Sequence, residues 1–478
     1  MAASKNISEM RDEDWVSPVN PATLVPLGRI AATTVGDVEL AVAAAAAAFD
    51  SIWSTDTRLR ARVLSAWAEL LTVRSPELVT ALIAETGKPV TEARCEIAGA
   101  IEALRYNAGM ARHLGGHAGT LSDGTVAHLV REPVGVTVFI APWNWPILLL
   151  LRDLAPALAA GVTAVVKPAP QTSLITRRVV ALGYEAGLPE RVVQVIVGGA
   201  AIGQVAIAQP AVRAVAFTGS TAVGADILSA AGNGMKRPLL ELGGKCSVVV
   251  FADADLDVAV NAAADAVVVT AGQMCLACTR ILADRRCYLE VLDRVIARLS
   301  GFVVGDPTSE HTKVGPVISP LAGERLTARL ATAALESTLV IGGERIRPEG
   351  LDGYFLSPAV ITDVNVTSPI VQEELFGPVV TVEPFDSTDA AVDLANATPF
   401  GLASAVWTAS LDRAWYVARS IRAGTVWVNG YQHSYPEVPS GGYKSSGLGR
   451  TRGVAGIEQF TELKHIHFSV AAPAEEGD

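Results

Sequence analysis

The stretch of sequence that decides the fold is 136–167, VTVFIAPWNWPILLLLRDLAPALAAGVTAVVK. It begins with an uncharged apolar run at 136–141, passes through a proline-bounded loop into a longer apolar stretch at 147–160, and ends on a second short run at 163–167. Continuous apolar runs of this length on either side of a helix-length segment are typical of parallel strands buried on both faces. The stretch therefore predicts a strand, a crossover helix and a second parallel strand.

The same alternation continues along the chain. We expect helices at 172–186, 202–209 and 222–232, and strands at 192–197, 214–218 and 239–241. A second series predicts strands at 248–251, from 281, at 379–384 and at 425–429, with helices at 254–271, 290–299 and 388–395. The first series is a doubly wound Rossmann-like sheet, which binds nucleotides at the carboxyl ends of its strands. The second series predicts a further α/β domain.

The N-terminal part of the chain is predicted to be helical. Residues 35–71 combine an alanine run with apolar residues spaced three and four apart, another helix follows Pro76, and a third is expected at 92–114. Short runs on both sides of Ser122-Asp123-Gly124 indicate a β-hairpin within 119–134. An isolated hairpin is marginally stable, so this one needs a surface to pack on.

Composition excludes several classes of protein. The 478 residues are 50% apolar with a net charge of −11, which supports a large core and disfavours nucleic-acid binding. Proline and glycine interrupt the longest uncharged stretches, 133–151 and 192–212, so we expect strands there and no membrane span. The start of the chain does not resemble a signal peptide. Five cysteines fit reduced thiols in a cytoplasmic protein rather than a disulfide framework.

The first candidate for chemistry is Cys275, in Gly-Gln-Met-Cys-Leu-Ala-Cys. A nucleophilic cysteine needs a depressed pKa and an open face, and the alternative is an inert buried thiol. Together with Cys278 it could also form a thioredoxin-like dithiol. None of the seven histidines has paired ligand spacing, so we expect no metal site.

Further candidates lie at strand ends. Glu241 precedes two glycines at the end of an expected strand and could act as a general base, or be an exposed loop charge. Asn144, held between prolines, could donate to an oxyanion or simply form the turn. The turn 217–224, Phe-Thr-Gly-Ser-Thr-Ala-Val-Gly, opens a helix that could bind phosphate. Lys167 could contact a ribose or phosphate, or lie on the surface.

Several short motifs occur in a fixed order. They are Pro-Trp-Asn-Trp-Pro at 142–146, Lys-Pro-Ala at 167–169, Phe-Thr-Gly-Ser at 217–220, Glu-Leu-Gly-Gly-Lys at 241–245, Gly-Gln-Met-Cys at 272–275, Glu-Glu-Leu-Phe-Gly-Pro at 373–378, Pro-Phe-Gly-Leu at 399–402 and Gly-Gly-Tyr-Lys-Ser-Ser-Gly at 441–447. In this order the chain resembles the NAD(P)-dependent aldehyde dehydrogenase superfamily from about residue 20 to residue 464. Glu241 and Cys275 are 34 residues apart, as the base and nucleophile of that family are.

The resemblance implies oxidation of an aldehyde to a carboxylic acid with NAD(P)⁺ as hydride acceptor. Cys275 would attack the aldehyde to give a thiohemiacetal and then a thioester, and Glu241 would activate the hydrolytic water. The side chain of Asn144 and the backbone N–H of Cys275 would hold the oxyanion. The positions that match the family's cofactor-binding residues are Trp143, Lys167, Gly219, Ser220, Gly224, Leu242, Glu374 and Phe376.

Two departures from the family pattern bear on cofactor choice and redox behaviour. Pro170 stands where many NAD-preferring members have a glutamate for the adenosine ribose. Losing that carboxylate removes an acceptor for the 2′-hydroxyl and a repulsion against a 2′-phosphate, so NAD or NADP is expected, with a slight preference for NAD. Cys278 replaces a small residue, and a disulfide between Cys275 and Cys278 could inactivate the enzyme.

The resemblance also implies how the chain is divided. The cofactor domain is expected at 1–115 and 134–243, the catalytic domain at 244–446, and a small β bridging element at 116–133 and 460–472. In the family this element pairs across subunits, so a homodimer or homotetramer is expected.

The substrate pocket is less defined. Trp145, Arg152, Tyr435 and Ser440 are the candidate residues. Arg152 matches an arginine that binds the substrate carboxylate in the succinic semialdehyde branch, but the second arginine of that branch is replaced by Val269. A semialdehyde-specific enzyme is therefore an alternative, and an Arg152–Asp153 charge pair at the surface or an interface is the simpler reading.

Other functions remain open from the sequence. A CoA-dependent acylating member would not need Glu241. A thiol-redox protein would use Cys275 and Cys278, and a catalytically silent structural protein would need none of the three proposed catalytic residues.

Overall fold

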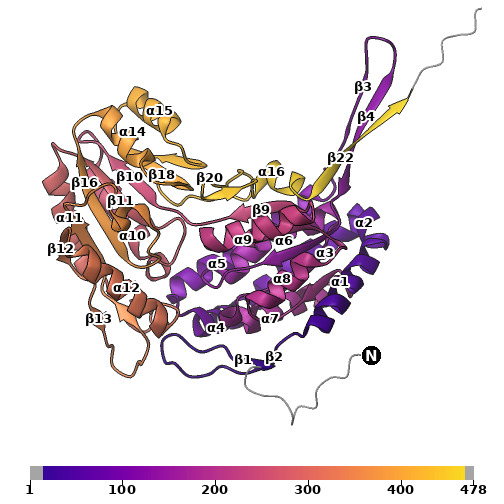
Figure 1. Ribbon diagram of the computed structural model, residues 1–478, viewed down its shortest axis with the longest axis horizontal. Helices are drawn as coiled ribbons and strands as arrows, with labels where there is room; N and C mark the ends of the chain where they lie inside the picture. Colours follow the sequence, from indigo (N-terminus) through magenta and orange to yellow (C-terminus); the bar gives the residue numbers. More distant parts are fainter. Residues whose placement is uncertain (1–13, 469–478) are drawn as a thin grey trace, which may run out of the picture.

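The computed structural model describes residues 14–468 and contains two large sheets (Figure 1). The first has six strands in the order β21-β9-β8-β5-β6-β7. Their bounds are β5 (Val136–Ile140), β6 (Thr163–Lys167), β7 (Val193–Val195), β8 (Val212–Thr218), β9 (Arg237–Glu241) and β21 (Gly447–Leu448). Strands β5 to β9 run parallel, and β21 pairs antiparallel with β9. The strand, helix and parallel strand predicted at 136–167 are confirmed.

Helices cover both faces of this sheet because successive residues of each strand point to opposite sides. On β5, Val136 and Val138 pack in a core with α1, α8 and α9, whereas Phe139 packs in a core with α3 to α7. The helices are α1 (Val35–Phe49), α3 (Thr57–Val73), α4 (Ser75–Thr86), α5 (Val90–Met110), α6 (Pro146–Ala160), α7 (Ser173–Glu185), α8 (Ala200–Ala208) and α9 (Thr221–Asn233). The doubly wound fold class is thereby confirmed.

The prediction that residues 35–71 are helical is confirmed, but the helix is interrupted twice. The chain forms α1, a short helix α2 (Ile52–Thr55) and α3. Ser51 caps α2 by accepting from the backbone N–H of Trp53, and Asp56 caps α3 by accepting from Arg58 and Leu59. These short polar side chains satisfy the free N–H groups of new helix starts, so the chain turns between helices while the apolar spacing continues.

The order of strands positions the binding crevice. Strand β5 has β6 on one side and β8 on the other, so the chain direction across the sheet reverses between β5 and β8. Ligands of open α/β sheets bind outside the carboxyl ends of the strands at such a switch point. The loop with Asn144 leaves β5 at this end, and the turn with Gly219 leaves β8.

The second sheet has seven strands in the order β12-β15-β16-β11-β10-β18-β19. All neighbours are parallel except β12 and β15. The strands are β10 (Cys246–Val250), β11 (Cys278–Asp284), β12 (Thr338–Ile341), β15 (Ala359–Thr362), β16 (Val379–Phe385), β18 (Ala403–Trp407) and β19 (Thr425–Val428). The helices are α10 (Leu256–Val268), α11 (Tyr288–Ser300), α12 (Pro320–Ala333), α14 (Thr388–Asn396) and α15 (Leu411–Ser420). The pattern missed β12, β15, β18, α12 and α15.

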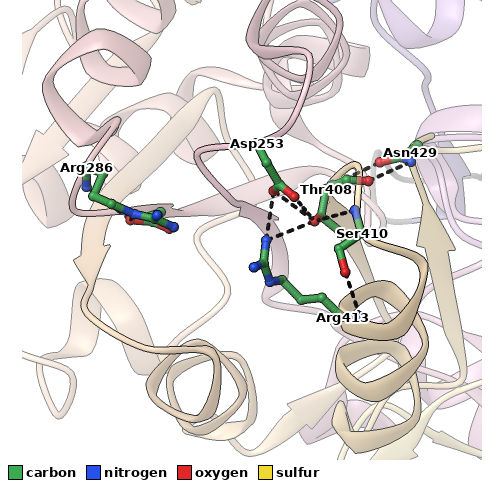
Figure 2. Close-up of polar contacts among 7 residues, drawn as sticks. Asp253, Arg286, Thr408, Ser410, Arg413 and Asn429 are labelled. Carbon is green, nitrogen blue, oxygen red and sulfur yellow. Dashed lines mark hydrogen bonds and ion pairs between the residues drawn. The ribbon is translucent and has the colours of Figure 1, made fainter.

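The carboxyl ends of β10, β18 and β19 are closed by a polar cluster (Figure 2). The carboxylate of Asp253 accepts from the hydroxyl of Thr408 at 2.8 and 3.0 Å and from Arg413 at 2.9 Å. Asn429 accepts from the backbone N–H of Thr408 and donates to its carbonyl, and Arg286 lies apart, paired with Asp284. The polar groups of this edge are bonded to one another, and Cys275 lies at the opposite end, just before β11 begins.

A third, three-stranded sheet projects from the body of the molecule (Figure 1). It consists of β3 (His117–Thr120), β4 (Val126–Pro133) and β22 (Thr461–Phe468), with β22 antiparallel to β4 from Thr461 opposite Pro133 to Phe468 opposite Val126. The predicted hairpin is therefore present, and β22 is the surface on which it packs. Residues 469–472 of the predicted bridging element lie outside the described residues.

The long uncharged stretches belong to these α/β layers. Residues 133–151 include β5, the loop after it and the first turns of α6, and 192–212 include β7 and α8. Within residues 14–468, no helix is both long enough and apolar enough to cross a membrane.

Candidate active site

A cavity of about 300 Å³ opens where the two large sheets meet, at the switch point between β5 and β8. It is lined by Pro142, Trp143, Asn144, Leu149, Thr218, Gly219, Ser220, Leu242, Gly243, Cys275, Glu374 and Phe376. Eight of these were predicted as catalytic or cofactor-binding residues. Residues from distant parts of the chain thus meet around one space, with Cys275 and Asn144 both on its wall.

Cys275 lies on a loop between α10 and β11. This loop replaces the last turn of the helix expected at 254–271, because Thr270 and Ala271 adopt left-handed φ values of 51° and 54°. The thiol is partly exposed in the cavity. Burial, together with the charges of Glu374, Cys246 and Glu241, raises its pKa to about 12, and the charge of Arg152 opposes this shift. The depressed pKa that a nucleophilic cysteine needs is therefore not found, because burial penalises the thiolate and two nearby carboxylates add to that effect.

Asn144 is fixed against the cysteine loop. Its side chain is buried, and Nδ2 donates to the carbonyl of Gln273 at 2.9 Å. Gln273 is held in turn, since its Nε2 donates to the carbonyl of Thr270 and its Oε1 accepts from the N–H of Ile318, both at 2.9 Å. A carboxamide has two N–H groups, so a second donor of Asn144 remains for an oxygen in the cavity. These hydrogen bonds fix the position of the Asn144 amide relative to the loop that carries Cys275.

Glu241 ends β9, directly opposite Thr218 of β8, beside the cavity rather than on its wall. It is buried and not an exposed loop charge. Burial raises its pKa to about 7, Arg152 opposes this, and Asp153 adds to it. Its Oε1 is buried and has no hydrogen-bond partner within the described protein. A carboxylate that titrates near neutrality with one free oxygen suits general-base chemistry.

Helix α5 supports both loops of the site from behind, which the sequence reasoning missed. Glu96 accepts from the backbone N–H groups of Ile147 and Leu148 at 2.8 and 3.2 Å, at the start of α6 just after Asn144. Glu92 accepts from the N–H and the hydroxyl of Thr270 at 2.8 and 2.9 Å. The sequence contains a pattern that could have indicated this support. Lys88, Glu92 and Glu96 recur at intervals of four, which places them on one face of a helix that is otherwise largely apolar on that face.

Two of the three charges of this support are fully buried, and Glu92 is half-buried. The ammonium of Lys88 forms an ion pair with Glu96, and both side chains are fully inaccessible. The same ammonium lies 4.0 Å from the ring centroid of Trp145. Burial raises the pKa of Glu92 to about 7, and Lys88 opposes this shift. Helix α5 therefore connects the Asn144 loop to the Cys275 loop through buried polar contacts.

The turn after β8 fits a phosphate group. Ser220 caps α9 by accepting from the N–H of Val223 at 3.4 Å, and the first N–H groups of this 13-residue helix have no partner within it. Gly224 allows close packing, because a Cβ there would lie 2.4 Å from Cδ2 of Leu242 and would have to displace that side chain. Helix and strand can therefore approach closely and leave the turn open to the cavity.

Glu374, Phe376 and Trp143 form the opposite part of the cavity. Glu374 accepts from the N–H of Gly244 at 2.9 Å, and burial raises its pKa to about 7. Phe376, with a left-handed φ of 59°, packs edge-on against Trp143 with 5.5 Å between ring centroids. These contacts place a carboxylate and two aromatic rings on the same cavity as Cys275, and their contact with a nicotinamide ribose and ring stays a prediction.

Lys167 lies at the carboxyl end of β6 but does not line the cavity. It is buried, and its Nζ donates to the carbonyl of Pro168 at 3.4 Å. Burial lowers its pKa to about 8. The alternative of a surface lysine is therefore wrong, whereas its contact with a ribose stays a prediction.

None of the four predicted substrate residues lines the cavity around Cys275. Trp145 is buried under Lys88, Tyr435 is 58% exposed, and the Ser440 hydroxyl is 3.0 Å from that of Thr451. Arg152 is paired with Asp153, as the simpler reading held, but the pair is buried rather than at a surface. The substrate roles of Trp145, Arg152, Tyr435 and Ser440 stay predictions.

Cys278 differs from Cys275 in its surroundings. It starts β11, is fully buried, and its thiol donates to the carbonyl of Arg280 at 3.7 Å. Burial raises its pKa far above the ordinary range. All five cysteines are free thiols in the structure. Among residues 14–468, no cluster of three or more His, Cys, Asp or Glu side chains is arranged to hold a metal ion.

Comparisons with known proteins agree with this site. The sequence profile of the aldehyde dehydrogenase family matches residues 8–466. An aldehyde dehydrogenase of Aspergillus niger is 39% identical, covering 94% of this chain and 91% of its own, and betaine aldehyde dehydrogenase of Bacillus subtilis is 36% identical, covering 95% and 96%. The crystal structure of an NAD-dependent aldehyde dehydrogenase from Sinorhizobium meliloti superimposes with a TM-score of 0.93 at 37% identity, covering 97% and 93%. The chain belongs to the aldehyde dehydrogenase family, and it is an oxidoreductase that acts on the aldehyde group.

Proposed function

We propose that this enzyme oxidises its aldehyde through a covalent thioester on Cys275, which water activated by Glu241 then hydrolyses to the carboxylate. The observation that carries the proposal is the meeting of Cys275 and Asn144 on one cavity, with the free Oε1 of Glu241 beside it. The glycine turn, Glu374 and Phe376 on the same cavity would hold NAD(P)⁺, which supplies a hydride acceptor when bound.

The steps follow from the side chains. The thiol of Cys275 must lose its proton before attack, and Glu241 is the nearby base that titrates near neutrality. The new C–S bond pushes the carbonyl electron pair onto oxygen, where the free N–H of Asn144 donates to it. Re-formation of the carbonyl releases a hydride and leaves the thioester. Glu241 then takes a proton from water as the oxygen attacks and the C–S bond breaks, so aldehyde, oxidised cofactor and water become carboxylate, reduced cofactor and two protons.

For the cofactor, we propose that both NAD and NADP are accepted, with a slight preference for NAD. Pro170 begins a short 3-10 turn after β6, so its place offers neither a carboxylate for the ribose hydroxyls nor a charge against a 2′-phosphate. We expect the two values of kcat/KM to differ by less than about tenfold, which corresponds to roughly 1.4 kcal/mol.

For the assembly, we propose the predicted division into a cofactor domain, a catalytic domain and a bridging element, and a homodimer or homotetramer. The three-stranded sheet that projects from the body supports this proposal, because Leu463 and Phe468 of β22 are 55% and 54% exposed. Exposed apolar side chains on a projecting sheet favour contact with another subunit. A cytoplasmic location stays a prediction from the sequence.

The test is a panel of neutral, cationic and anionic aldehydes with NAD and with NADP, followed by the absorbance of the reduced cofactor. Cys275→Ala should abolish reduction, and its full activity would exclude the proposed mechanism. Cys278→Ser should remain active, whereas a dithiol enzyme would lose its activity. A CoA-dependent enzyme would need a thiol acceptor for turnover, and a structural protein would reduce neither cofactor.

A further inference from the structure

Arg152 and Asp153 form a buried charged unit next to Glu241. They are consecutive on α6, and their side chains are each 7% exposed. Nε of Arg152 donates to Oδ1 of Asp153 at 2.9 Å and Nη2 donates to Oδ2 at 2.8 Å, which is a bidentate pair. Neighbouring residues of a helix do not ordinarily face each other, so this pairing fixes the direction of the guanidinium.

The remaining donors of Arg152 reach the ends of two strands of the cofactor sheet. Nη2 also donates to the hydroxyl of Thr218, at the end of β8, at 2.8 Å. Nη1 lies 3.8 Å from Oε2 of Glu241, at the end of β9. Asp153 and Thr218 therefore occupy the donors of Nε and Nη2, while Nη1 faces the carboxylate of Glu241.

We infer that Arg152 is a positioning residue for the general base. It holds Oε2 of Glu241 by charge, leaves Oε1 free for water, and favours the ionised carboxylate in a buried site. The negative charge of Asp153 partly offsets the positive charge that Arg152 presents to Glu241. The inference rests on the proposed role of Glu241 as general base. A distance of 3.8 Å permits attraction without a hydrogen bond, so the carboxylate keeps its capacity to accept a proton.

The charges around Glu241 set the direction of each effect. Burial raises its pKa; the positive charge of Arg152 on α6 lowers it; Asp153 on the same helix raises it; and Arg450 and Arg452, on the turn after β21, lower it. The carboxylate of Glu241 in turn raises the pKa of the Cys275 thiol. Removing Arg152 should raise the pKa of Glu241, and neutralising Asp153 should lower it.

The test compares Arg152→Met, Arg152→Lys and Asp153→Asn with the wild-type enzyme. The titration of Glu241 is followed by the infrared carboxyl stretch, as the difference between each protein and the same protein carrying Glu241→Gln. We expect the midpoint to rise by about one unit in Arg152→Met, to fall in Asp153→Asn and to stay near the wild-type value in Arg152→Lys. The pH profile of kcat for an uncharged aldehyde should move in the same directions.

The outcomes separate this inference from others. An unmoved infrared midpoint in a folded Arg152→Met protein, or shifts of the same sign for Arg152→Met and Asp153→Asn, contradicts the positioning role. A rise in KM confined to carboxylate-bearing aldehydes would instead assign Arg152 to the substrate. If Arg152→Met does not fold, Thr218→Val, which removes only the hydroxyl anchor, should raise the midpoint by a smaller amount, and no change would count against the inference. A shifted infrared midpoint without turnover in any form of the protein would refute the proposed function alone.

Discussion

Replacing Glu96 by Gln removes a charge from the centre of the support behind the active site. Lys88 and Glu96 are both fully buried, and Glu96 also accepts from Ile147 and Leu148 at the start of α6. Breaking a buried ion pair by neutralising one partner costs about 3–5 kcal/mol, because the other charge stays buried without compensation. The nearby ring of Trp145, 4.0 Å from the ammonium, offsets only part of that cost.

The expected result is a fall in Tm of roughly 6–20 °C, taking 2–4 °C for each kcal/mol in a domain of this size. Thermal unfolding followed by fluorescence measures it. The matched control is Arg94→Met on the same helix, which breaks the exposed pair with Glu310 and should leave Tm unchanged within the error. The double variant Lys88→Met with Glu96→Gln should recover part of the loss, since it leaves no unpaired charge. A Tm for Glu96→Gln equal to that of Arg94→Met would refute the reasoning.

Three further predictions concern the cavity itself. Asn144→Ala should lower kcat by about 10²–10³-fold through loss of an oxyanion donor, with cofactor affinity retained; steady-state kinetics and a cofactor titration check both. Gly244→Ala should abolish activity, because its Cβ would lie 2.4 Å from the carbonyl oxygen of Cys275, whereas Gly119→Ala has open space and should not change it. The hydrolytic rate should rise with pH through a midpoint near 7, since Glu241 accepts a proton only when ionised and burial raises its pKa to about 7; a flat profile between pH 6 and 8 would exclude it as the base.

The layers of the fold were predictable where apolar periodicity and glycine or proline breaks agree. The strand at 163–167 was placed to the residue, because a short apolar run lies between the glycine that ends α6 and the proline that follows Lys167. The helix breaks at Ser51 and Asp56 were missed, since capping side chains interrupt the chain without interrupting the apolar spacing. Strand β18 was missed, because the Pro399-Phe400-Gly401-Leu402 motif leads directly into its first residue, Ala403, with no glycine or proline break between them.

The members of the candidate site were predictable from their motifs, but their mutual placement was not. Cys275 and Asn144 meet on one cavity, as the resemblance implied. The role of Arg152 was not predictable, because the sequence gives its position on α6 but not the oxygens of Asp153, Thr218 and Glu241 that surround it. The raised pKa of Cys275 likewise depends on burial and on the carboxylates of Glu374 and Glu241, which come from distant parts of the chain.

The most direct test of the central claim is to trap the covalent intermediate. The Glu241→Gln protein is mixed with an aldehyde substrate and NAD(P)⁺. The reaction is quenched with acid within the first turnover, and the protein is analysed by peptide mass spectrometry. A thioester on Cys275 predicts up to one equivalent of reduced cofactor per site, formed more slowly than in the wild type because Glu241 also takes the thiol proton. The acyl group should then accumulate on the peptide containing Cys275, because the base for hydrolysis is missing. Turnover at the wild-type rate without such an adduct, or an acyl group on another residue, would contradict it.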